Sequence, residues 1–152
     1  MSWVGNVIAA VGAIQIGKYN KKLFDEQARL QRAETERRRA VYNKIDRPRL
    51  IKDQNRADSE LFVSLLRSGA EFRPGTTPYL VRLESRFNQA TDLAIADYNE
   101  TTAYQAGYNN ASLLTAKGDV ALMQGYLTAA GEGAKAYSSA TSTKNESGSL
   151  LG

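Results

Sequence analysis

The sequence contains no cysteine and no histidine, and its 152 residues include three prolines and one tryptophan. Without cysteine, the chain can form neither a disulfide nor a thiolate metal site. Without histidine, it lacks the commonest general base and the commonest metal ligand. Catalysis therefore has little support, and we predict a non-enzymatic protein with no catalytic residues, no metal site and no cofactor.

The sequence also has little that predicts β-structure. There is no alternating polar and apolar run of useful length, and no turn dipeptide falls at hairpin spacing. Small and polar residues dominate the second half of the chain. We therefore predict an all-α fold: an elongated helical hairpin of long helices with an apolar N-terminal helix, assembling into a ring or tube.

From Ser2 to Gly17 the chain carries no charge. At helical spacing, one face of this segment is predicted to insert into a membrane or a partner, through Trp3, Val4, Val7, Ile8, Val11 and Ile14. Gly5 and Gly12 lie on another face, where close packing between helices is expected. The segment is shorter than the roughly 20 residues that cross a bilayer. Burial in an oligomer and insertion into a membrane both remain open.

The net charge of +4 is unevenly distributed along the chain. Between Lys18 and Arg56 there are 13 basic residues against 6 acidic ones. Such a block can approach an anionic membrane surface or nucleic acid phosphate. The predicted contact residues are Lys18, Lys21, Lys22, Arg37, Arg38 and Arg39. A solvated helix face with interleaved acids is the alternative, and any DNA contact would be non-specific.

We expect five segments along the chain. They are an apolar Gly/Ala-rich helix over 1–17, a charged helical arm over 18–68, a loop over 69–78, a long helix over 79–137 and a flexible tail over 138–152. Pro48 is expected to break or kink the arm, because proline lacks a backbone donor and restricts the preceding residue. Pro74-Gly75 predicts the turn in the loop.

The long helix changes character along its length, because large apolar side chains come first and glycine and alanine follow. Gly118 and Gly125 are seven residues apart and in line with Ala111, a spacing that permits close approach between helix backbones. We therefore predict helix packing at these three residues. Asp92, Asp97 and Glu100 are interpreted as a solvated helix face.

The run Ile95 to Ala130 resembles the C-terminal helix of small internal virion proteins, or ejection proteins, of short-tailed podovirus-type bacteriophages. The resemblance consists of tyrosine-asparagine steps followed by alanine and glycine at heptad-like intervals. The matching positions are Tyr98-Asn99, Tyr108-Asn109, Ala111, Leu114, Ala116, Gly118, Ala121 and Gly125. The order of segments also agrees over about two thirds of the chain. The prolines at positions 74 and 78 depart from the family pattern, and the chain is on the short side for the family.

The resemblance implies a bacteriophage protein stored in the capsid interior, in a core near the portal. Such a protein leaves the virion at infection and helps to form a channel across the host cell envelope, at the outer membrane, for genome delivery. The partners implied are further copies of the chain, the portal, other internal virion or tail proteins, and envelope lipid. Two alternatives remain: a purely structural portal or tail adaptor or core scaffold, and a basic helical protein that binds nucleic acid.

Overall fold

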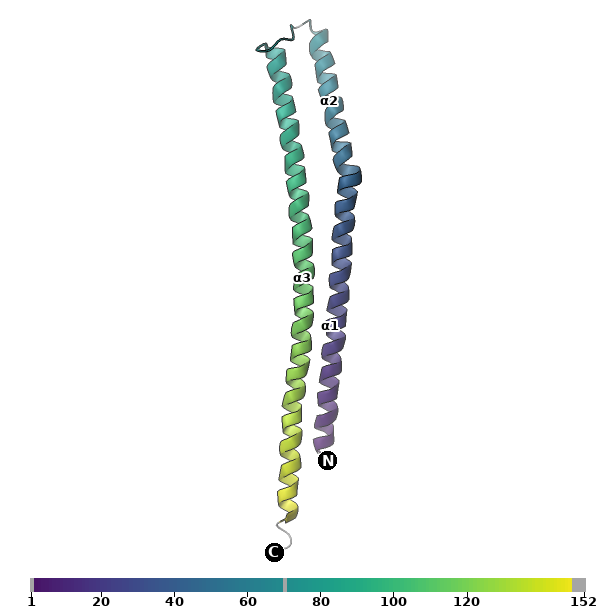
Figure 1. Ribbon diagram of the computed structural model, residues 1–152, viewed down its shortest axis with the longest axis vertical. Coiled ribbons are helices and arrows are strands. Elements are labelled where there is room, and N and C mark those ends of the chain that lie inside the picture. The colour runs from purple at the N-terminus through teal and green to yellow at the C-terminus, as the bar shows by residue number, and fades with distance from the viewer. Residues whose placement is uncertain (1, 70, 149–152) are drawn as a thin grey trace. The chain divides into compact units, whose positions relative to one another are not determined.

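The computed structural model describes residues 2–69 and 71–148, and it describes the side chains of residues 3–69 and 71–141. Within these residues all regular structure is helical, which confirms the all-α prediction. The helices are α1 (Ser2–Val41), the π-helical turn η1 (Tyr42–Asp46), α2 (Arg47–Arg67) and α3 (Thr77–Gly148), as Figure 1 shows.

The chain divides into two compact units. Unit 1 contains Met1–Arg32 and Asn109–Gly152, so it combines the first part of α1 with the second part of α3. Unit 2 is Ala33–Tyr108, which contains the end of α1, η1, α2 and the first part of α3. In each unit two helical segments far apart in the sequence run antiparallel to each other (Figure 1).

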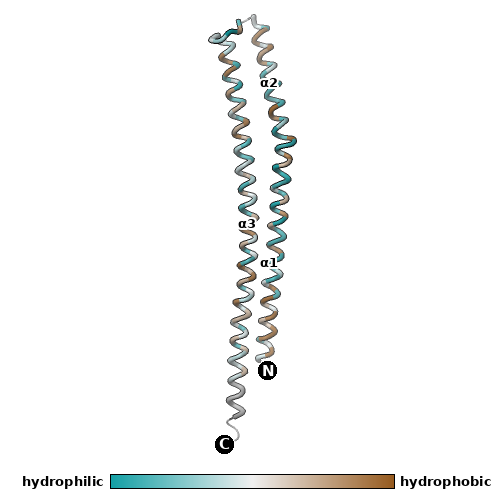
Figure 2. The backbone as a smooth tube through the Cα atoms, viewed as in Figure 1, coloured by the Kyte–Doolittle hydropathy of each residue, from teal (hydrophilic) through white to brown (hydrophobic). Residues whose placement is uncertain are grey.

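Helix α1 continues through Gly17 to Val41, so the segment expected over 1–17 is the first part of a longer helix. The residues after Gly17 explain the continuity. They are rich in Lys, Glu, Gln, Arg and Ala, which are strong helix formers, and they include no proline before Pro48. The boundary at position 17 marks a change of polarity instead of an end of structure, as the hydropathy colours of α1 show (Figure 2).

Pro48 is accommodated without ending the helical path. The turn before it widens into η1, and the backbone N–H of Arg47 donates to the carbonyl oxygen of Tyr42, five residues earlier. Pro48 has no N–H with which to donate to the carbonyl four residues before it, and a wider turn is one way in which a helix absorbs such a defect. Pro48 then lies in the first turn of α2, where its missing donor costs little.

The connection between α2 and α3 lies between Arg67 and Thr77, where the sequence predicts a loop over 69–78. Gly69 has a φ of 71° and donates its N–H to the carbonyl oxygen of Leu66, a common way to end a helix. Gly75 has a φ of 90°, which the predicted turn requires. Thr76 precedes α3, and its carbonyl accepts the N–H of Leu80. Helix α3 then continues past Tyr137 to Gly148, so 138–148 is helical where a flexible tail was expected; residues 149–152 lie outside the described part.

The buried part of the protein is small. Among the residues whose side chains are described, the buried apolar residues are Ala28, Ala111, Ala129 and Ala136, and no large side chain is fully buried. Large apolar side chains are instead exposed along α1, α2 and α3. Among the described side chains neither unit therefore has a conventional hydrophobic core, and the contacts between its paired helices hold each unit together.

Candidate functional site

In unit 1 the two helices approach each other through glycine. A Cβ built on Gly125 would lie 2.8 Å from the carbonyl oxygen of Ala13 and 3.0 Å from the Cα atom of Gly17. One built on Gly118 would lie 3.2 Å from the Cβ atom of Phe24. At Gly125 these neighbours are backbone atoms, which cannot rotate away. The glycine therefore sets how closely α1 and α3 lie.

Alanine continues this contact along both helices. Ala111 is fully buried, with 0% of its surface exposed, and Ala28 is almost fully buried. Together with Gly118 and Gly125, Ala111 thus lies on the buried face of α3. We call the contact formed by Gly17, Ala28, Ala111, Gly118 and Gly125 the small-residue seam of unit 1.

Outside this seam, the apolar residues predicted to meet lipid or a partner are uncovered. Trp3, Val4, Val7, Ile8 and Val11 are exposed, Ile8 to 67%, and Ile14 is half-buried. The space next to Gly5 and Gly12 is empty, since a Cβ at either position would have no neighbour within 4 Å. Unlike at Gly118 and Gly125, a side chain added at either of these two glycines would therefore meet no atom of the described residues.

No helix in the described part of the chain is long and apolar enough to cross a membrane.

In unit 2 the paired helices are joined by polar groups instead. Asp97 of α3 accepts a hydrogen bond from the Tyr42 hydroxyl at 2.8 Å and two from the Arg47 guanidinium, at 2.9 and 3.2 Å. Tyr42 and Arg47 are five residues apart, a spacing that the wide turn of η1 brings to the same side of the helix. The hydrogen bonds from Arg47 and then Tyr42 lower the pKa of Asp97. Asp97 is therefore a cross-helix acceptor, which corrects its interpretation as part of a solvated face.

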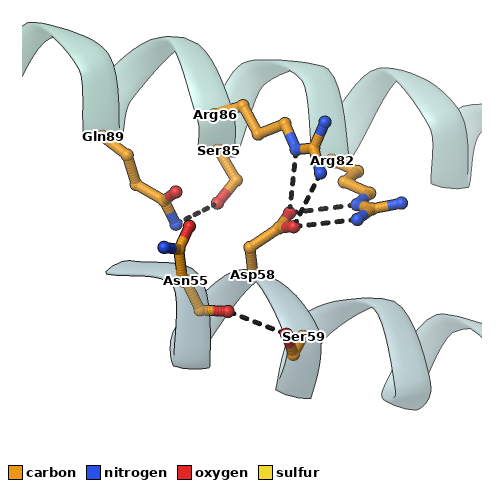
Figure 3. Close-up of polar contacts among 7 residues, drawn as sticks. All are labelled: Asn55, Asp58, Ser59, Arg82, Ser85, Arg86 and Gln89. Carbon is orange, nitrogen blue, oxygen red and sulfur yellow. Dashed lines mark hydrogen bonds and ion pairs between the residues drawn. The ribbon is translucent and has the colours of Figure 1, made fainter. Parts of the chain in front are cut away.

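Asp58 of α2 forms the second polar junction of unit 2. It is largely buried and accepts bidentate hydrogen bonds from two arginines of α3, Arg82 at 3.0 and 2.8 Å and Arg86 at 3.3 and 3.0 Å (Figure 3). These bonds, that from Arg82 most strongly, lower the pKa of Asp58 well below its usual range. The Arg82 guanidinium also stacks 4.2 Å from the centre of the Phe62 ring. No local sequence pattern predicts this cluster, because Asp58 is 24 and 28 residues away from its two arginines.

Two tyrosines of α3, Tyr104 and Tyr108, also contact the helix opposite. Tyr108 donates a hydrogen bond of 2.5 Å to Glu36, which raises the pKa of Tyr108. The Arg39 guanidinium lies 4.1 Å from the centre of the Tyr104 ring. Nearby, the buried Thr35 side chain fills the space beside Gly107, where a Cβ would clash with it. These contacts lie between α1 and α3 within unit 2.

The basic residues predicted to meet an anionic surface have different surroundings. In unit 1, Lys18 and Lys22 are exposed, whereas Lys21 bonds to Asp119 across the helix pair and lies 3.4 Å from Asp25. The hydrogen bond to Asp119 is the main reason why the pKa of Lys21 is raised. In unit 2, Arg37 is exposed, Arg38 pairs with Glu34 at 2.5 Å and Arg39 stacks on Tyr104. The six predicted residues therefore fall three in each unit, and three of them, Lys21, Arg38 and Arg39, have partners within the chain.

The described residues contain no group of three or more acidic side chains placed to ligate a metal ion. Comparison with protein-family models, with curated proteins and with solved structures gives no match to this chain.

Proposed function

We propose that this chain is a bacteriophage internal virion protein that self-assembles and acts in genome delivery. In this proposal it is stored in the capsid near the portal, together with other internal virion or tail proteins. It is released at infection and helps to form a channel across the host envelope. The ring or tube is an assembly of several copies, since two paired helices cannot enclose a channel.

The exposure of the uncharged segment carries the proposal. Large apolar side chains from Trp3 to Val11 face solvent in unit 1 although the helix that bears them is paired with α3. Contiguous exposed apolar surface is uncommon on soluble monomers and marks sites of contact with protein or lipid. Lys18 and Lys22 follow the segment and are exposed, as is typical of helices that lie at an anionic membrane surface. The resemblance of 95–130 to ejection proteins supports the same function.

A structural virion subunit is the second candidate, and one observation favours it. The described helices include none that can cross a bilayer alone. In this alternative the segment over 2–17 docks permanently on the portal or tail, and the protein has no affinity for lipid.

Dye release from lipid vesicles separates the two functions. We would compare the full chain with a variant in which Val7, Ile8 and Val11 are each replaced by Gln. Since these side chains are exposed, their replacement should preserve the helix pair. The proposal predicts release by the full chain from vesicles containing anionic lipid, and at least a tenfold weaker release by the variant.

The matched control makes the same replacement by Gln at Leu80, Leu83 and Phe87, which are exposed apolar residues of α3 in unit 2. This control should release dye as the unmodified chain does. Neither release nor vesicle binding by the unmodified chain would overturn membrane activity and support the structural subunit. Equal loss in both variants would show that general hydrophobicity, and not the segment over 2–17, is responsible.

A further inference from the structure

Helix α3 carries a second apolar stripe in unit 1, in addition to the seam that contacts α1. Its large members are exposed and recur at alternating steps of three and four residues, with alanines at the intervening positions. They are Leu113, Val120, Met123, Leu127 and Tyr137. On a helical wheel this stripe is centred about 165° from the buried face that contains Ala111 and Gly118. It thus points away from α1.

Helix α1 has an exposed stripe with the same spacing. It consists of Gly5, Gly12, Ile16, Tyr19, Leu23 and Leu30, which are all exposed except for the half-buried Gly12. Glu26 interrupts it at one position. The stripe is centred about 140° from the face that contains Gly17 and Ala28. It is also distinct from the broader face of Val4, Val7 and Val11, so a contact at one face leaves the other free.

The shape of these stripes indicates a helix as the occupant. A heptad stripe is as narrow as the contact between two helices in a coiled coil, whereas a lipid surface covers a broad face. The α3 stripe is flanked by polar residues, including Lys117 and Gln124, that would remain at the edge of a helical contact. Apolar heptad positions with polar flanks become buried when they pack against a second helix that has the same spacing.

The two stripes also occupy the same height along unit 1. Gly17 of α1 is level with Ala121 and Gly125 of α3, and Phe24 is level with Gly118. Since both helices rise equally per residue, Tyr19 is level with Val120 and Leu23 with Ala116. In a ring whose axis is parallel to the helices, rotation from one copy to the next preserves height. The α3 stripe of one copy would then meet the α1 stripe of its neighbour along their full lengths.

The chain has surface available for such a contact. It exposes 11406 Å², whereas a compact monomer of 16.7 kDa exposes about 7,600 Å². The difference far exceeds the roughly 800 Å² that each partner contributes to a stable interface.

We propose that the α3 stripe of one copy binds the α1 stripe of the next, in a head-to-tail contact between two different faces. The proposal rests on the self-assembly in the proposed function and adds to it the faces that meet. Two unlike faces on each copy allow every copy to contact two neighbours, which is how cyclic assemblies form. A single stripe that bound only the same stripe of another copy would stop at a dimer.

Cysteine cross-linking tests which faces meet, because the chain has no cysteine of its own. Full-length Tyr19→Cys and full-length Val120→Cys would be mixed and oxidised, and each would also be oxidised alone. We expect disulfide-linked dimers in the mixture at least fivefold above those in either protein alone. Leu23→Cys mixed with Ala116→Cys provides a second pair at matched height, and circular dichroism checks that every variant is helical.

The control pair is Lys22→Cys with Lys117→Cys, which are exposed and level but lie outside both stripes. It should give no excess of mixed dimers. Dimers formed equally by each single variant would overturn the proposal in favour of like faces meeting. The mass of the unmodified chain by light scattering distinguishes the remaining results. An oligomer in which neither pair cross-links would overturn the proposed faces alone, whereas a monomer would overturn self-assembly as well.

Discussion

The helices of unit 1 are joined through glycine and alanine, whereas those of unit 2 are joined through carboxylates, arginines and hydroxyl groups. In unit 1 a close approach at Gly118 and Gly125 replaces large buried side chains. In unit 2 the contacts of Asp58 and Asp97 are directional and permit few alternative alignments of the two helices. The close approach of the two backbones thus fixes the alignment of the helices in unit 1, and hydrogen bonds between side chains fix it in unit 2.

The two kinds of helix contact use different side chains and leave different ones exposed. Unit 1 uses its smallest residues for internal contact, so its large apolar side chains remain available on the outer faces. Unit 2 relies on polar contacts of modest strength individually. In the proposed function the chain leaves a capsid through a narrow tail, which requires its helix pairs to open at a low cost in free energy. Two helix pairs with few buried side chains suit that proposal.

The largest effect is expected from filling the seam of unit 1. Gly125→Leu places a side chain where backbone atoms of Ala13 and Gly17 already lie. We predict a loss of about 3 kcal/mol in the free energy of unfolding, as for other overpacked sites. Urea unfolding followed by circular dichroism measures it.

Gly133→Leu is the matched control, because a Cβ at Gly133 would have no neighbour within 4 Å. That variant should gain stability, by up to about 0.8 kcal/mol from helix propensity. Equal effects of the two substitutions would contradict the role of Gly125 in close packing.

The next largest effect is expected in unit 2. Asp58→Ala leaves Arg82 and Arg86 close together without their shared carboxylate. We predict a loss of about 2 kcal/mol, the size of hydrogen bonds to charged groups. Asp92→Ala, at an exposed position of α3, is the control and should change stability much less. A loss in Asp58→Ala no greater than in the control would show that the polar junction does not order unit 2.

Acid should weaken unit 2 through its carboxylates. The pKa values of Asp58 and Asp97 are lowered in the folded protein. Their contribution to folding stability is therefore complete above the ordinary aspartate pKa of about 3.9. It is lost as the pH falls through the lower pKa values of the folded protein. We therefore predict that the melting temperature falls as the pH is lowered below 4, and that it falls less in Asp58→Asn. Thermal unfolding followed by circular dichroism between pH 6 and pH 2 tests this.

In unit 1 the group with a shifted pKa is Lys21, and its pKa is raised in the folded protein instead of lowered. Because Asp119 raises the pKa of Lys21, the contribution of Lys21 to stability is complete below the ordinary lysine pKa and is lost as the pH rises through the raised value. An acid dependence that is unchanged in Asp58→Asn would contradict the assignment to unit 2.

The smallest effect is expected at the polar contact of unit 1. Lys21 and Asp119 are both solvent-accessible, and exposed ion pairs contribute little to stability. Lys21→Gln should unfold at nearly the same urea concentration as the unmodified chain, as should Lys22→Gln. If Lys21→Gln were as unstable as Asp58→Ala, unit 1 would depend on polar contacts as unit 2 does.

The sequence alone predicts the features of this fold that depend on local pattern. Helical class, the turn at Pro74-Gly75 and the importance of Gly118, Gly125 and Ala111 follow from spacing within one segment. The structure places these three residues on the face that contacts α1. The exposure of Val4, Val7 and Ile8 is likewise compatible with the predicted contact face, although their partner remains a prediction.

Features that depend on the pairing of distant segments are not visible in the sequence. Asp97 and Asp58 find their arginines only when α3 lies against the preceding helices, at separations of 50 and 24 residues. The π-helical turn before Pro48 is similarly hard to predict, since a proline can end, kink or widen a helix. Tertiary contact decides between these outcomes.

The central claim is that copies of this chain cover apolar faces that a single copy leaves exposed. Sedimentation equilibrium of the full chain over a range of concentrations tests it most directly. We predict a mass several times that of the 16.7 kDa monomer, which falls in Gly125→Leu because that substitution disturbs the helix pair whose outer faces meet. A monomer at all concentrations, with a high and sharply cooperative melting transition, would contradict the account.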